Sequence, residues 1–133
     1  MEWKYVKTLS SVECIDEFEN LVEYSFPDEF KNCILSSNGG RPSKRMFDTD
    51  IQKERAIKSF LSFNKDDKET VWKIQDWKKE ELSSRYVAFA IDNFGNLVCF
   101  DIYSNKIVFF DHENGEIELI ADNFTEFMEC LYE

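Results

Sequence analysis

The sequence lacks any long hydrophobic run, and its cysteines are few and far apart. No stretch approaches the ~18 consecutive apolar residues of a membrane-spanning helix, and no apolar signal-peptide segment follows Met1. We therefore expect a cytoplasmic protein without a membrane partner. No close Cys-x-x-Cys pair typical of zinc sites is present, and disulfides need an oxidising compartment. We expect all four cysteines to act as small buried hydrophobic residues: Cys14, Cys33, Cys99 and Cys130.

Basic residues are also in short supply. The chain has 16 lysines and arginines against 27 aspartates and glutamates, a net charge of −11. Partners that are nucleic acids are disfavoured, because proteins that bind a phosphate backbone present a net basic face. The charge is uneven: residues 1–30 carry −6 (2 minus 8), 31–65 carry +5 (8 minus 3), 66–82 carry −2 (4 minus 6) and 83–133 carry −8 (2 minus 10). We interpret the basic middle as a solvated face, since it lacks the aromatic residues of an RNA-binding patch.

The motifs of common catalytic sites are missing. There is no Gly-x-Ser-x-Gly elbow, no phosphate-binding glycine loop and only one histidine, His112. A histidine between Asp111 and Glu113 could bind a metal or act as a general base, but we favour a polar residue at a hairpin tip. Residues 92–96 superficially resemble a calcium loop, yet the glycine stands at position 4 instead of 6 and Tyr103 replaces the ligating glutamate. We expect no enzyme activity, no cofactor, no metal and no small-molecule substrate.

Aromatic residues, in contrast, are abundant: 13 phenylalanines, 5 tyrosines and 3 tryptophans, in a chain that is 43% hydrophobic. This composition predicts a folded domain. A capping box of Ser10 and Glu13 predicts that a first helix begins there, and Pro27 separates it from a second helix that ends at 37–40. In the less regular middle, 41–50 suggests a loop with one short strand. Residues 56–63 suggest a strand, although 51–58 could equally begin a helix.

The last half of the sequence is more regular. A third helix is predicted to begin near 66–69, with an apolar stripe of Val71, Ile74, Trp77 (or Lys78) and Leu82. Strands are predicted at 86–91, 97–102, 107–110 and 117–120, spaced as in an antiparallel meander. Asn123 or Asp122 then caps a closing helix. These elements predict a single α+β domain over residues 1–133, with an antiparallel or mixed sheet flanked by N-terminal and C-terminal helices.

Several short motifs occur in the order found in a known superfamily. They are Phe26-Pro27-x-x-Phe30, Asn38-Gly39-Gly40-x-Pro42, Phe60-Leu61-Ser62-Phe63, Phe89-Ala90-x-Asp92-x-Phe94-Gly95-Asn96, Ile107-Val108-Phe109-x-Asp111-His112 and Ile120-Ala121-Asp122-x-Phe124-x-x-Phe127. Together they resemble the SUKH superfamily, which groups bacterial toxin-immunity proteins with fungal Smi/Knr cell-wall regulators. Two positions depart from the family pattern: 83–85, where a Leu-Pro pair is usual, and Asn123, where serine is common.

The resemblance implies a SUKH-like α+β fold and a binding function. Bacterial members of the superfamily neutralise polymorphic or contact-dependent toxins, often nucleases, by direct association, and the family brings no catalytic residues. A cognate toxin with a basic surface is the expected partner, and a non-catalytic regulatory or scaffold module of the Smi/Knr kind is the alternative. We expect the acidic chain ends to form or flank the partner surface, including Asp16, Glu17, Glu23, Glu113, Glu116 and Glu118.

Overall fold

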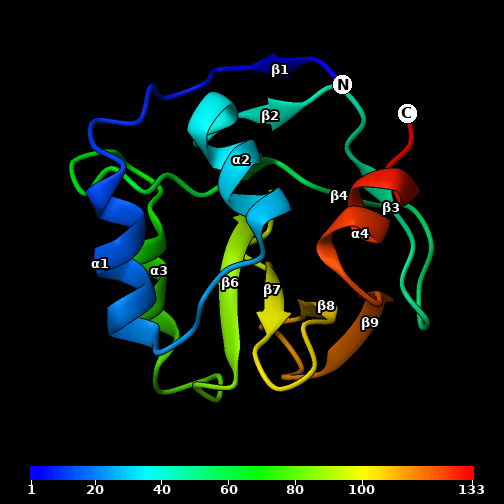
Figure 1. Cartoon of the computed structure of the whole chain (residues 1–133). Coiled ribbons are helices and arrows are strands. Elements are labelled where there is room, and N and C mark those ends of the chain that lie inside the picture. The colour runs from blue at the N-terminus through cyan, green and yellow to red at the C-terminus, as the bar shows by residue number, and fades with distance from the viewer.

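The centre of the molecule is a five-stranded antiparallel sheet (Figure 1). The computed structural model describes all residues, 1–133. Its strands run in sequence order, β5-β6-β7-β8-β9, so each pairs with its neighbour in the chain. Their bounds are β5 Ser59–Phe60, β6 Tyr86–Ile91, β7 Leu97–Asp101, β8 Ile107–Phe110 and β9 Ile117–Ala121. The predicted meander is confirmed, and the sheet is antiparallel throughout.

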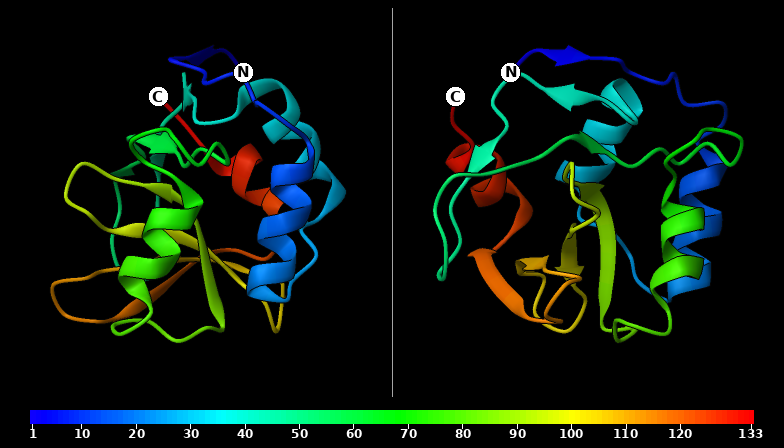
Figure 2. Two further views of the ribbon diagram at one scale, coloured as in Figure 1. Left: turned by 90° about the vertical axis from the view of Figure 1, so that its left-hand side faces the viewer. Right: turned by 180° about the vertical axis from the view of Figure 1, so that it is seen from behind.

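Four helices accompany the sheet: α1 Glu13–Val22, α2 Asp28–Ser37, α3 Val71–Lys78 and α4 Phe124–Cys130. Helices α2 and α4 lie next to each other over one face, while α1 and α3 lie together at one side (Figures 1 and 2). The Asn123 side chain accepts a hydrogen bond from the Glu126 N–H at 2.8 Å, which confirms one of the two predicted caps of α4.

The start of α1 differs from the prediction. The predicted capping box at Ser10 does not form, because the Ser10 N–H donates to Asn64 Oδ1 at 2.8 Å. The Ser11 hydroxyl instead accepts from the Glu13 N–H at 3.2 Å, and the helix begins at Glu13. Helix α3 is likewise capped later than expected, since the Thr70 side chain accepts from the Lys73 N–H. Helix α1 therefore begins at Glu13 instead of directly after Ser10, and α3 begins at Val71 instead of near 66–69.

Two short ribbons complete the fold. Strand β1 (Trp3–Lys4) pairs with β2 (Arg41–Pro42), and β3 (Met46–Phe47) pairs with β4 (Arg55–Ala56). The strand predicted over 56–63 is thus divided between β4 and β5, which belong to different sheets. No helix forms over 51–58.

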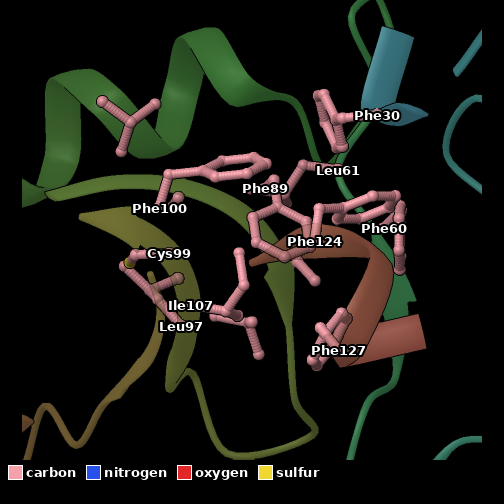
Figure 3. Packing of buried hydrophobic residues seen from close by; sticks show 14 of the residues in the cluster. Phe30, Phe60, Leu61, Phe89, Leu97, Cys99, Phe100, Ile107, Phe124 and Phe127 are labelled. Carbon is pink, nitrogen blue, oxygen red and sulfur yellow. The ribbon is translucent and has the colours of Figure 1, made fainter. Parts of the chain in front are cut away.

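Phenylalanine fills the core. Of the 13 phenylalanines, only Phe94 is exposed; the other twelve belong to a cluster of 29 buried hydrophobic residues. Phe30 of α2 is central, because its ring lies 5.4 Å from that of Phe89 and 5.2 Å from that of Phe124, measured between centroids. Figure 3 shows these rings pointing toward one another between the helices and the sheet. The core therefore holds α2 and α4 against each other and against the same sheet face.

Candidate functional site

The His112 side chain makes structural contacts only. Its Nε2 atom lies 2.7 Å from the Phe94 carbonyl oxygen in the turn between β6 and β7. In that turn both carboxylate oxygens of Asp92 accept hydrogen bonds, from the backbone N–H groups of Phe94 and Asn96 and from the Asn96 amide. Residues 92–96 are therefore a tight turn closed by its own aspartate, as predicted. No group of three His, Cys, Asp or Glu side chains lies close enough to hold a metal ion.

Glu118 requires a correction. It was expected on an acidic partner surface, but its residue is only 2% exposed. Both of its carboxylate oxygens bind Arg55, at 2.9 and 2.8 Å, and Thr49 donates to the same carboxylate at 2.7 Å. Arg55 of β4 and Thr49, from the segment between β3 and β4, cover this side chain of β9. The Glu118 carboxylate is thus bonded within the chain, and Glu118 is no longer a candidate partner-binding residue.

The acidic residues of α1 are exposed to solvent. Asp16 and Glu17 on this helix and Glu23, its C-cap residue, are all exposed, and Glu17 pairs with Lys65 at 2.8 Å. Glu19, between them, has a structural role: it accepts from the Phe26 N–H at 2.7 Å and lies 3.2 Å from Lys31. Figure 2 shows that α1 lies at the edge of the molecule with its long side open.

Glu113 and Glu116 are exposed at a different place. Both lie in the turn between β8 and β9, where the Glu113 N–H donates to Asp111 and the Glu116 N–H donates to Asn114. The C-terminal end of α1 instead contacts the turn before β8, because the Tyr24 hydroxyl donates to Asn105 at 2.7 Å. The two groups of predicted residues therefore lie at opposite ends of β8 and do not form one site.

The two acidic ends of the chain do meet elsewhere, between α2 and α4. A pair of adjoining hollows there is lined by residues of both helices, among them Glu29, Cys33, Phe124, Glu126, Met128 and Glu129. We call this surface the acidic trough. A further hollow beyond Ser25 continues it to Glu23, directly after α1. No lysine or arginine lines any of the three hollows.

The trough was missed as a site, although the sequence carried a signal for it. The net charges of −6 and −8 at the two chain ends predict an acidic surface wherever those ends come together. That they come together follows from the packing of Phe30 on Phe124, which no local pattern reveals. Burial within this region also raises the pKa of the Cys33 thiol to about 11, so it is a poor nucleophile.

An exposed aromatic pair lies away from the trough. Phe94 is 76% exposed and Trp77 is 47% exposed, and the Trp77 ring lies 6.5 Å from the His112 ring. Of the two alternatives for the α3 stripe, Lys78 is the buried residue and Trp77 faces solvent. Asp76 and Lys79 beside Trp77 pair with each other at 3.0 Å.

The cysteines follow the prediction in part. All four are free thiols, and burial raises the pKa of Cys99 to about 12. Cys14 and Cys33 are half-buried, whereas Cys130 at the end of α4 is exposed, contrary to expectation. Cys130 is the last residue of α4, whose buried side chains are those of Phe124 and Phe127.

Comparison with known proteins identifies a family. The family model SUKH_6, described as SMI1-KNR4 cell-wall, matches residues 13–128. The match begins at the first residue of α1, includes the whole five-stranded sheet and ends within α4. No curated protein matches the chain. No helix in the structure combines the length and the apolar character that a membrane crossing requires.

Proposed function

This chain belongs to the SMI1-KNR4 family of the SUKH superfamily, and from that premise we propose that it is an immunity protein. It binds a cognate bacterial toxin of a polymorphic or contact-dependent system and neutralises it by direct contact. Residues 1–133 act as one domain in the cytoplasm and catalyse no reaction themselves. The toxin presents a basic surface, as a nuclease does where it binds its substrate.

One observation carries this proposal: the acidic ends of the chain expose their carboxylates without matching bases. Asp16 on α1, Glu23 at its C-cap, and Glu29, Glu126 and Glu129 at the trough are exposed and make no ion pair within the chain. Such a surface repels nucleic acid and attracts a basic protein. Electrostatic attraction raises association rates to about 10⁸–10⁹ M⁻¹s⁻¹ at low salt, against about 10⁵–10⁶ M⁻¹s⁻¹ for neutral partners. Rapid capture suits a protein that must intercept a lethal enzyme.

The second candidate is a regulatory or scaffold module of the Smi/Knr kind, which the cell-wall description of the matching family favours. It too would act by binding, so the acidic surface alone does not separate the two. The neighbouring gene distinguishes the two candidates, because an immunity protein is encoded beside its toxin, whereas a regulator needs no such neighbour.

Co-expression tests the proposal directly. The product of the adjacent gene is expressed in a bacterial host, alone and together with this protein, and growth and co-purification are both measured. We expect the neighbour to arrest growth alone, and this protein to restore growth and to co-purify with it. A neighbour that arrests growth whether or not this protein is present contradicts the proposal, as does a harmless neighbour. An unrelated SUKH protein expressed at the same level is the control for specificity.

A further inference from the structure

The acidic trough combines an apolar floor with an acidic rim. Phe124, 3% exposed, forms part of the floor, and the half-buried side chains of Cys33 and Met128 lie beside it. Glu29 from α2 and Glu129 from α4 line both hollows, so the rim has a carboxylate on each side. We infer that this trough receives a lysine- or arginine-rich amphipathic helix of the partner. The inference rests on the proposed function for the nature of that partner.

The rim carboxylates favour a basic occupant because they lack internal partners. Glu29, Glu126 and Glu129 make no ion pair within the chain, and no lysine or arginine lines either hollow of the trough. Unpaired like charges on both sides of one groove repel each other, and a cation placed between them relieves that repulsion. Charge complementarity of this kind fixes the register of a complex and accelerates its formation.

The shape of the trough favours a helix over a strand. A partner strand must add to a free sheet edge, but the trough is bounded by α2 and α4 and presents no such edge. At the β9 edge, the backbone of Leu119 is already bonded by Asp50: its carbonyl accepts from the Asp50 N–H at 3.0 Å and its N–H donates to Asp50 Oδ1 at 2.9 Å. A groove between two helices instead accepts the apolar face of a third, through side chains spaced three and four residues apart.

A synthetic peptide provides the probe. It has about 18 residues of leucine and lysine, long enough for helix formation, with leucines at helical spacing along one face. A second peptide of the same composition in scrambled order has the same charge but no apolar face. Binding to the full chain is measured by fluorescence anisotropy at low and at physiological salt. We expect the amphipathic peptide to bind at least about tenfold more tightly than the scrambled one.

Two matched double variants locate the binding site. Glu126→Lys with Glu129→Lys alters the trough, and Glu113→Lys with Glu116→Lys alters the β8–β9 turn; each changes the net charge by the same amount. We expect the trough variant to weaken binding about tenfold or more and the turn variant to change it by less than about threefold. Equal losses in both variants would show binding by overall charge alone and overturn the inference, as would failure of the wild-type protein to bind the amphipathic peptide.

Hydroxyl-radical labelling of the wild-type protein gives an answer that does not depend on any variant folding. With the peptide bound, Met1 and Met128 at the trough should be protected, while Phe94 and Trp77 should be labelled as in the free protein. Protection of the aromatic pair instead would place the helix elsewhere and overturn the inference. Growth rescue is scored separately: if rescue succeeds while the trough stays unprotected, only this inference falls, and if rescue fails while the peptide protects the trough, the proposed function falls.

Discussion

Arg55 and Glu118 meet in a two-point ion pair beneath the molecular surface. The guanidinium donates from Nε at 2.9 Å and from Nη2 at 2.8 Å to the two carboxylate oxygens, with side chains 13% and 2% exposed. The same guanidinium lies 4.1 Å above the centre of the Phe109 ring. The pair therefore ties β4 of the small ribbon to β9 and β8 of the main sheet.

Removing one member of this pair should lower the free energy of unfolding more than removing any exposed acidic side chain of the protein. In Glu118→Gln the shape is kept but the Arg55 charge loses its counter-ion, and we expect a loss of about 3 kcal/mol in the free energy of unfolding, measured by urea denaturation. The exposed Glu116→Gln serves as control and should change it by less than about 0.5 kcal/mol. A Glu118→Gln protein as stable as the control would mean that the ion pair contributes nothing to the stability of the fold.

Glu118 also shows where sequence reasoning fails. The strand predicted at 117–120 is present as β9, but burial of an acidic residue within it depends on Arg55, 63 residues earlier in the chain. Helix and strand patterns are local, so the meander and the cap at Asn123 were predictable. Long-range packing divides residues 55–60 between two sheets and brings the acidic ends of the chain together. Such packing produces no periodic pattern in the sequence.

Lys78 is a second buried charge, and this one has no partner. Its residue is fully buried, its amine makes no hydrogen bond, and burial lowers its pKa from the ordinary value of 10.5. Lys78→Met keeps the length of the side chain and removes the unsatisfied amine. We expect it to raise the free energy of unfolding at pH 7 by about 1–3 kcal/mol.

The pH dependence of this effect has a definite sign. Because the folded-state pKa of Lys78 is lower than its unfolded value, the unfolded chain binds the extra proton between the two, and wild-type stability rises with pH there. The advantage of Lys78→Met should therefore be full below the folded-state pKa and shrink toward pH 10.5. Denaturant titrations of both proteins at pH 7 and pH 10 measure it; an advantage that does not shrink would show that the amine stays protonated in the folded protein at both pH values and that burial does not lower its pKa.

The extent of the phenylalanine core predicts unfolding in a single step. Its members come from all four helices and from the main sheet, including Phe18 of α1, Phe30 of α2, Val71 of α3 and Phe124 of α4. Phe30→Ala opens a cavity at the centre and should lower the free energy of unfolding by about 3–5 kcal/mol. Far-ultraviolet circular dichroism and tryptophan fluorescence should give coincident transitions in both proteins. Separate transitions would show that residues 1–133 are not one domain.

Association with the proposed toxin partner should depend on the acidic face of α1 and its C-cap. Asp16 and Glu17 are exposed on this helix and Glu23 at its C-cap, and Glu23 lines the hollow that continues the acidic trough. Reversing all three to lysine replaces attraction of a basic partner with repulsion at the point where it approaches. We expect the association rate, measured by stopped-flow fluorescence at low salt, to fall about tenfold or more.

The salt dependence separates steering from direct contact. Screening shortens the reach of exposed charges to about 8 Å at physiological ionic strength, so the difference in association rate between wild type and the triple variant should narrow as salt is added. The dissociation rate should change less, because long-range attraction acts before the complex forms. If α1 were only a solvated helix face, the triple variant would associate at the wild-type rate at every salt concentration, and the role proposed for Asp16, Glu17 and Glu23 would have to be given up.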